Sequence, residues 1–180
     1  KKNSNALRVE RVMDTVFDRA LKETVRQARQ VPVMINYSVG KKRFEKAPDR
    51  DDLTLLRKIE ETDIPYQFPT AKLQKGDKTS DPFSVGITHV HHFYFRRNLW
   101  VLSCIWSKVI NHELKFALMF LITSIIMKTG SKLHNIGFKN GKINLAGAMP
   151  NALYIPSTIA ERNIIDLSRS KINYIISAFT

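Results

Sequence analysis

Apolar residues recur at helical spacing near the start of the chain. Between residues 7 and 29 they follow one another every three or four positions: Val9, Val12, Met13, Val16, Phe17, Ala20, Leu21, Val25 and Ala28. This spacing places them along one stripe of a helix. The pattern therefore predicts one long amphipathic helix over 7–29, with its mixed charges on a solvated face.

The period changes after Pro32, because proline disfavours the continuation of a helix. Alternate positions from Val31 to Val39 are apolar or aromatic, which predicts a strand. Gly40 then begins a predicted turn in which four cations surround Phe44: Lys41, Lys42, Arg43 and Lys46. Cations around an aromatic ring can hold a phosphate backbone while the ring stacks on a base. An ordinary solvated turn explains the same residues equally well.

Helical spacing returns after Asp49, which is placed to cap a helix over 50–61. Three residues of this helix are expected to face inward: Leu53, Leu56 and Ile59. A segment rich in proline and glycine follows over 62–86. Because a loop of this length is unusual in a compact domain, we expect it to be the chief mobile segment.

The middle of the chain predicts two consecutive helices. Residues 87–95 predict a short strand or an extended entry to a helix over 98–110. The next helix, over 113–128, is apolar nearly all round, so it should be buried on most sides. Gly130 is well placed to end it.

The last fifty residues carry weaker signals. Residues 131–149 are loop-like with a possible short hairpin at 137–141, and 152–155 predict a short strand. Thr158 and Glu161 fit a capping box that opens a helix to about residue 171. The apolar ending, 172–179, resembles a strand cut from a longer chain.

These patterns together predict an α+β fold that is mostly helical with a few short strands. We divide the chain into a basic N-terminal part over 1–61, the loop over 62–86 and a helical core region over 87–180. The three parts are expected to form one folding unit overall.

Charge changes the picture more than composition does. The hydrophobic share of 43% is ordinary, but the net charge is +13 and the isoelectric point about 10.0. Residues 1–50 hold 13 basic and 6 acidic residues, and residues 82–180 hold 11 and 3. A balance this basic favours a polyanionic partner, nucleic acid before an anionic membrane surface, over a merely solvated surface.

Cys104 is the only cysteine, so neither an intrachain disulfide nor a cysteine-based zinc ribbon can form within the chain. This is consistent with a reducing compartment, and we expect a cytoplasmic location. The N-terminus lacks the apolar core of a secretory signal. The most apolar run, 114–127, is shorter than a membrane span needs, so no membrane partner is expected.

Two clusters between residues 89 and 97 are candidates for binding. His89 and His91 would share one side of a strand, and neutral imidazoles could begin a metal site. A hydrogen-bonded structural cluster or a DNA-facing patch is favoured over a metal site, so no metal ligand is assigned. Arg96 and Arg97 lie near a predicted helix N-terminus, where phosphate contact is slightly favoured over a pair of surface arginines.

Signatures of catalysis are missing from the sequence. It contains no Gly-x-Ser-x-Gly elbow, no Gly-x-Gly-x-x-Gly loop and no Walker loop. Only Glu113, Glu161 and Asp166 are acidic after residue 81, which leaves little material for a paired-carboxylate hydrolase. We therefore assign no catalytic residue.

Four stretches follow one another along the chain: Val31–Lys46, Ile64–Thr70, Gly86–Leu99 and Ala152–Ser157, the last followed by Glu161-Arg162-Asn163. Together, and in this order, they resemble the central region of bacterial DNA methylases of the adenine-specific, zinc-ribbon-containing type. The third stretch is the most specific. The resemblance implies an amino-methyltransferase that moves a methyl group from S-adenosylmethionine to adenine N6 or cytosine N4, as in restriction–modification.

The chain departs from that family in the parts that perform the reaction. It has no Pro-Pro pair, hence no Asp-Pro-Pro motif, and no Phe-x-Gly-x-Gly motif for the methyl donor. No donor-binding or catalytic residue can therefore be carried over, and the chain alone is expected to bind no cofactor and to be inactive. The resemblance implies a DNA-binding, target-recognition or structural segment. Its expected partners are DNA and either the missing catalytic portion of the enzyme or a partner subunit.

Eight residues are the predicted DNA contacts: Lys41, Lys42, Arg43, Lys46, His89, His91, Arg96 and Arg97. An independent nucleic-acid-binding module without enzyme activity is the principal alternative. A histidine-based metalloenzyme and a scaffold for a catalytic partner chain are further ones.

Overall fold

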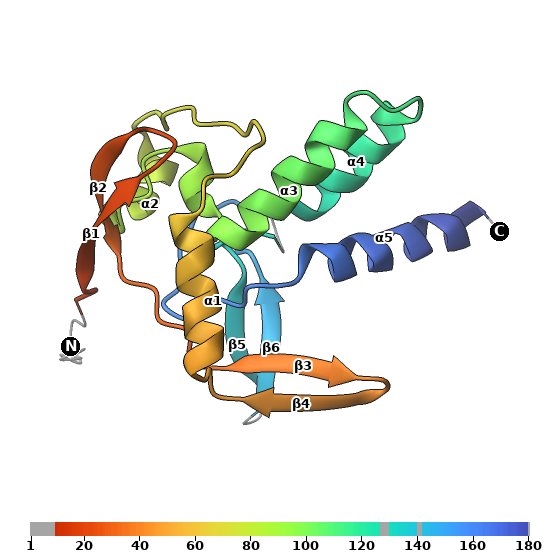
Figure 1. Ribbon diagram of the computed structural model, residues 1–180, viewed down its shortest axis with the longest axis horizontal. Coiled ribbons are helices and arrows are strands. Elements are labelled where there is room, and N and C mark those ends of the chain that lie inside the picture. The colour runs from red at the N-terminus through yellow and green to blue at the C-terminus, as the bar shows by residue number, and fades with distance from the viewer. Residues whose placement is uncertain (1–9, 127–129, 140–141, 180) are drawn as a thin grey trace, which may run out of the picture. The chain divides into compact units, whose positions relative to one another are not determined.

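The structure is a computed structural model that describes residues 10–126, 130–139 and 142–179 (Figure 1). The chain forms two compact units, Lys1–Pro48 and Asp49–Thr180. Helices and short antiparallel strands are both present, which confirms the predicted α+β class. The boundary at Pro48 assigns the helix over 50–61 to the second unit rather than to an N-terminal part.

The first unit begins with a β-hairpin where one long helix was predicted. Strand β1 (Met13–Asp18) pairs antiparallel with β2 (Glu23–Ala28), and Val16 lies opposite Val25. The Oδ1 atom of Asp18 accepts hydrogen bonds from the amides of Ala20 and Leu21 at 2.9 and 3.1 Å, which folds the connection into a turn. The helix predicted over 7–29 is therefore wrong across its described residues.

A second hairpin follows. Strand β3 (Ile35–Val39) pairs antiparallel with β4 (Lys42–Lys46) across the turn at Gly40 and Lys41. The alternation before Gly40 is thus confirmed as a strand from Ile35 onward. The charged segment after Gly40, predicted to be a turn, is mostly strand β4.

The second unit begins with α1 (Arg50–Glu61), which Asp49 caps as predicted. The expected loop over 62–86 holds a single turn of 3₁₀-helix, η1 (Asp77–Thr79), and a short helix, α2 (Ser80–Ser84). The backbone of this loop is hydrogen-bonded to the segment that follows it: the amide of Leu73 donates to the carbonyl of Thr88 at 2.9 Å. A 3₁₀-helix, η2 (Val90–Phe93), lies within 87–95, where a short strand or an extended entry to the next helix was predicted.

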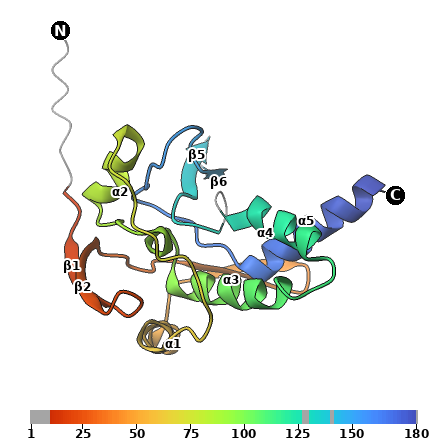
Figure 2. The same cartoon turned by 90° about the horizontal axis from the view of Figure 1, so that it is seen from above.

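Three helices build the core of this unit: α3 (Arg96–Val109), α4 (Lys115–Ile126) and α5 (Ile164–Phe179). Each contacts the other two, and Figure 2 shows them side by side. Six of their buried apolar residues form one cluster: Leu102, Val109, Ile122, Ile125, Ile164 and Leu167. The predictions of helices at 98–110 and 113–128 are confirmed within a few residues, except that 127–128 lie outside the described residues.

The burial predicted for the apolar helix is wrong. Phe116 and Phe120 of α4 are 77% and 68% exposed, although Leu121, Ile122 and Ile125 are buried. The inward face predicted for α1 is also only partial, because Leu53 is exposed while Leu56 and Ile59 are half-buried. No helix among the described residues is long and apolar enough to cross a membrane.

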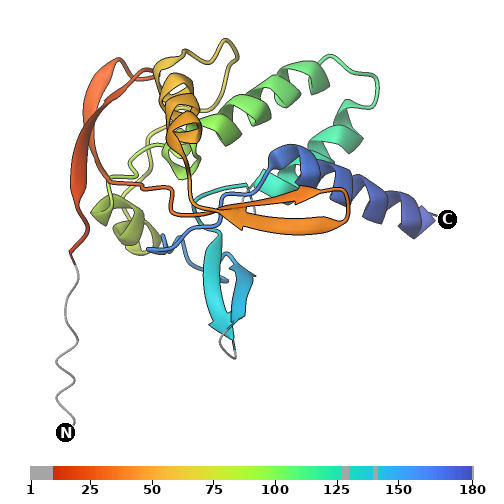
Figure 3. The same cartoon turned by 60° about the horizontal axis from the view of Figure 1, so that its bottom comes forward.

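The remaining elements follow α4. Strands β5 (Asn135–Lys139) and β6 (Lys142–Gly147) form a hairpin that projects away from the three helices (Figure 3). It is longer than the hairpin predicted at 137–141, of which residues 140 and 141 lie outside the described residues. No strand forms at 152–155. Helix α5 begins six residues after Thr158, because Asn163 supplies the cap by accepting the amide of Ile165 at 2.9 Å. The helix continues over the described residues of 172–179, where a strand was predicted.

Candidate nucleic-acid interface

The tip of the β3–β4 hairpin gathers three of the predicted DNA contacts. Gly40 has a φ of 60°, which suits the first central position of a type II′ hairpin turn. Lys41 completes the turn, and Lys42 and Arg43 follow it on β4. All three cations are exposed. The ribbon therefore carries a cluster of positive charge at its end.

One face of the hairpin is aromatic and cationic, and we call it the aromatic face. Alternation along the paired strands places six residues on it: Ile35, Tyr37, Val39, Lys42, Phe44 and Lys46. The rings of Tyr37 and Phe44 stack across the strands, with centroids 5.6 Å apart and 25° between their planes. These two residues remain 42% and 41% exposed. On the opposite face, the amide of Asn36 donates to Glu45 at 3.0 Å.

Arg96 is used within the second unit. Its Nε atom donates to the backbone carbonyls of Ile59 and Thr62, both at 3.1 Å, and its Nη2 atom donates to Thr62 as well. The carbonyls at the end of a helix lack intrahelical partners, and Arg96 satisfies them at the end of α1. The predicted phosphate contact by Arg96 remains a prediction, but its guanidinium already joins α1 to α3.

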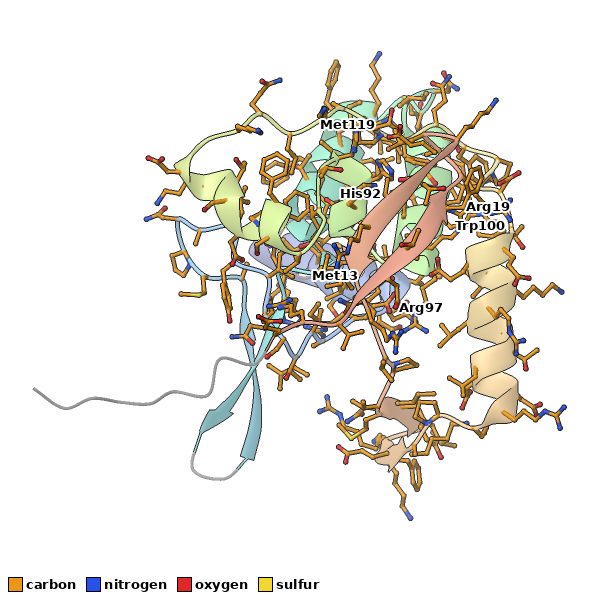
Figure 4. The ribbon with its side chains drawn as sticks, turned by 90° about the vertical axis from the view of Figure 1, so that its left-hand side faces the viewer. Met13, Arg19, His92, Arg97, Trp100 and Met119 are labelled. Atoms are coloured by element: carbon orange, nitrogen blue, oxygen red, sulfur yellow. The ribbon has the colours of Figure 1, made fainter. Side chains whose placement is uncertain are left out.

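Arg97 forms an ion pair with the carboxylate of Glu161 at 2.6 Å, and Figure 4 shows it on the first turn of α3. Hydrogen bonding to Glu161 is the main cause that raises the pKa of Arg97 further above its usual value. The other carboxylate oxygen, Oε1, is buried without a hydrogen-bond partner among the described residues. A phosphate at Arg97 would have to compete with this carboxylate.

The histidine cluster is a packed hydrogen-bonded group. His91 and His92 are buried, and their ring centroids lie 4.3 Å apart. The backbone amide of Thr88 donates to Nδ1 of His92 at 3.2 Å, and the Thr88 hydroxyl lies 2.9 Å from Nδ1 of His89. Because an amide can only donate, neutral His92 carries its proton on Nε2. That nitrogen then has no lone pair for a metal ion, which favours the structural interpretation of His92.

His89 and His91 do not share one strand, because His91 lies in η2 while His89 precedes it with an extended backbone that bridges to Lys72. His91 is only 7% exposed, so little of its ring is accessible. His89 is half-buried. DNA contact by His89 and His91 stays a prediction, and the hairpin offers the more accessible surface.

A buried lysine lies near Glu161 and was not predicted. Lys132 is 9% exposed, and its Nζ atom lies 5.4 Å from the centroid of the Phe95 ring. Burial lowers the pKa of Lys132 to about 8, against the opposing charges of Glu60 and Glu161. The sequence carries no local signal for this, since the burial depends on elements far apart in the chain.

A cavity of about 170 Å³ opens in the second unit beside η2. Six residues line it: Val90, Phe93, Tyr94, Ser131, Leu133 and Leu153. None of the six carries a charge at neutral pH, so they offer no ionic contact to the amino-acid part of a methyl donor.

No family model, no curated protein and no solved structure matches this chain. The charges and contacts described above therefore carry the functional argument.

Proposed function

We propose that this chain is a DNA-binding, target-recognition segment of an S-adenosylmethionine-dependent DNA amino-methyltransferase. The observation that carries the binding part is the β3–β4 hairpin, whose tip exposes Lys41, Lys42 and Arg43. A two-stranded ribbon fits the major groove of B-DNA, and cations on it can contact the phosphates. The net charge of +13 supports the same partner.

The enzymatic part of the proposal rests on the four resembling stretches, which include the hairpin sequence itself. In this proposal the donor-binding and catalytic motifs belong to another part of the enzyme or to a partner subunit. This chain then contributes affinity for DNA, while methyl transfer to adenine N6 or cytosine N4 takes place elsewhere. The chain alone should neither bind the donor nor transfer a methyl group.

The test measures fluorescence anisotropy of a labelled DNA duplex across a series of salt concentrations. We expect affinity to fall steeply with salt, because each neutralised phosphate releases counterions. Replacing all three tip cations by glutamine (K41Q/K42Q/R43Q) should reduce the slope of log K against log salt by about 2 to 3 units, close to 0.9 per lost contact.

The matched control removes the same charge elsewhere. Lys58, Lys75 and Lys108 are exposed on three separate segments of the second unit, and K58Q/K75Q/K108Q lowers the net charge equally. This control should leave the slope nearly unchanged. An equal reduction of this slope in both triple variants would mean that the net charge of the chain, rather than a localised site at the hairpin tip, determines DNA binding. Absence of duplex binding at low salt would contradict the DNA-binding role, and calorimetric binding of S-adenosylmethionine would contradict the assignment of the donor site to another part.

A further inference from the structure

The aromatic face of the β3–β4 hairpin has chemistry that a DNA duplex does not use. Base pairs in a duplex already stack on one another, so an exposed aromatic side chain finds no free base face there. In a single strand, or around a displaced base, the faces are available, and aromatic side chains bind them by stacking. Tyr37 and Phe44 keep roughly two-fifths of their surfaces exposed.

The cations on the same face lie where a strand backbone would pass. Lys42 and Lys46 are each two residues from Phe44 along β4, one toward the tip and one toward the base of the hairpin. Strand residues rise about 3.3 Å each, so the two lysines stand roughly 13 Å apart with the aromatic ring between them. A nucleic-acid strand crossing this face can place a base on the ring and a phosphate toward each lysine.

We infer that the aromatic face of the β3–β4 hairpin binds unpaired nucleotides, with a base stacked on the Tyr37–Phe44 pair and the backbone held by Lys42 and Lys46. This inference rests on the proposed nucleic-acid-binding function and names its substrate as single-stranded or locally unpaired DNA. Stacking on an aromatic ring tolerates any base, so little sequence preference is expected from this face.

A simpler role for the aromatic pair is to stabilise the hairpin, as cross-strand aromatic pairs do. The experiment must therefore separate stacking on a base from loss of the hairpin. Three labelled probes achieve this with the full chain: a single strand of mixed sequence, its duplex, and a single strand of equal length built from abasic nucleotides. The abasic strand keeps the phosphates and lacks the bases.

We expect the natural chain to bind the mixed single strand about tenfold to a hundredfold more tightly than the abasic strand, in line with stacking of one base on an aromatic side chain. The variants Phe44→Leu and Tyr37→Leu/Phe44→Leu keep apolar side chains but remove the aromatic surface. They should lose most of that difference, while their affinity for the abasic strand and the duplex changes less than about threefold. Phe116→Leu/Phe120→Leu on α4, with two exposed aromatic rings outside the hairpin, should behave as the natural chain.

The other outcomes overturn the inference in distinguishable ways. Equal loss of affinity for all three probes would show that the pair only supports the hairpin. Equal binding of the mixed and abasic strands by the natural chain, or a preference for the duplex, would rule out stacking while leaving the proposed DNA binding intact. Absence of binding to every probe at low salt would reject both together.

Discussion

A single buried lysine links the stability of the second unit to pH. Two carboxylates interact electrostatically with the amine of Lys132: Glu60 of α1, and Glu161, which precedes α5. Glu161 also forms the ion pair with Arg97 of α3. The two carboxylates favour the charged amine, but burial opposes it more strongly and lowers the pKa of Lys132 to about 8. Because the ordinary value is 10.5, the unfolded chain holds this proton more tightly than the folded chain does.

The direction of the pH dependence follows from linkage. Between pH 8 and 10.5 the unfolded chain binds more protons at this site, so the contribution of Lys132 to the free energy of unfolding rises with pH. Below pH 8 the full penalty applies, about 3 kcal/mol for a shift of this size. Lys132→Met should therefore stabilise the protein at pH 7 by up to about 3 kcal/mol, and by about 2 kcal/mol less at pH 9.5.

Urea unfolding of the natural chain and of Lys132→Met at the two pH values measures this difference. Titrating groups that do not interact with Lys132 act alike in both proteins, so the difference between them reports on Lys132 and on its interaction with Glu60 and Glu161. If the variant were less stable than the natural chain at pH 7, the favourable interaction between the charged lysine and Glu161 would outweigh the free-energy cost of burying that charge.

At the scale of elements, α1 depends on its cap. The Oδ1 atom of Asp49 accepts the amides of Asp51 and Asp52 at 3.0 and 2.9 Å, and Oδ2 of Asp52 accepts the amide of Asp49 at 3.0 Å. No residue of α1 is fully buried, so packing does little to replace this cap. Asp49→Ala should lower the free energy of unfolding by about 1 kcal/mol, measured by urea unfolding.

Asp49→Asn provides the control, because asparagine caps a helix about as well as aspartate. It should unfold within a few tenths of a kcal/mol of the natural chain. If Asp49→Ala had the same free energy of unfolding as Asp49→Asn, the reciprocal hydrogen bonds around Asp49 would contribute nothing measurable to stability.

The same helix shows why some elements were predictable from the sequence. The cap at Asp49 and the apolar spacing of α1, α3 and α4 are local signals, and those three helices form close to where they were predicted. The cations of the hairpin tip were found in the same way, from neighbours in the sequence. Local hydrogen bonds and local spacing decide such features.

The first hairpin was missed because its stabilising contacts are not local. Val16 pairs with Val25 nine residues away, while the same valines also fit a helical stripe. Branched side chains such as Thr15, Val16, Thr24 and Val25 favour strands, and the Asp18 side chain closes the turn. The sequence fits both the spacing of a helix and the alternation of a strand, and pairing between β1 and β2 selects the strand.

The cap of α5 was misplaced for a similar reason. The capping box at Thr158 is a sound local signal, but the carbonyl of Thr158 accepts the amide of Ile136, and Ile159 bridges to Asn135. Pairing with β5 keeps this backbone extended, so α5 begins only after Asn163, which supplies the cap.

In the candidate site, the pairing of Phe44 with Tyr37 was not predicted. The two-residue turn that begins at Gly40 nevertheless sets the strand register that places Tyr37 opposite Phe44.

At the scale of the whole molecule, the two units differ in how they are stabilised. The second unit has a cluster of buried apolar side chains among α3, α4 and α5. None of the described residues of the first unit, 10–48, is buried. A two-stranded hairpin on its own is only marginally stable in water. The proposed binding surface therefore lies on a unit that opens easily.

Hydrogen exchange followed by mass spectrometry should separate the units. Amides of β1–β4 should exchange within seconds to minutes, while those of α3 and the buried part of α4 should exchange orders of magnitude more slowly, at rates set by the stability of the core. A ligand that binds only the folded hairpin stabilises it by mass action. A saturating mixed single strand should therefore slow exchange in β3–β4 and leave β1–β2 unchanged. Strong protection of both hairpins without a ligand would show that the first unit has a stable core of its own, and protection confined to the second unit on adding DNA would move the binding surface away from the hairpin.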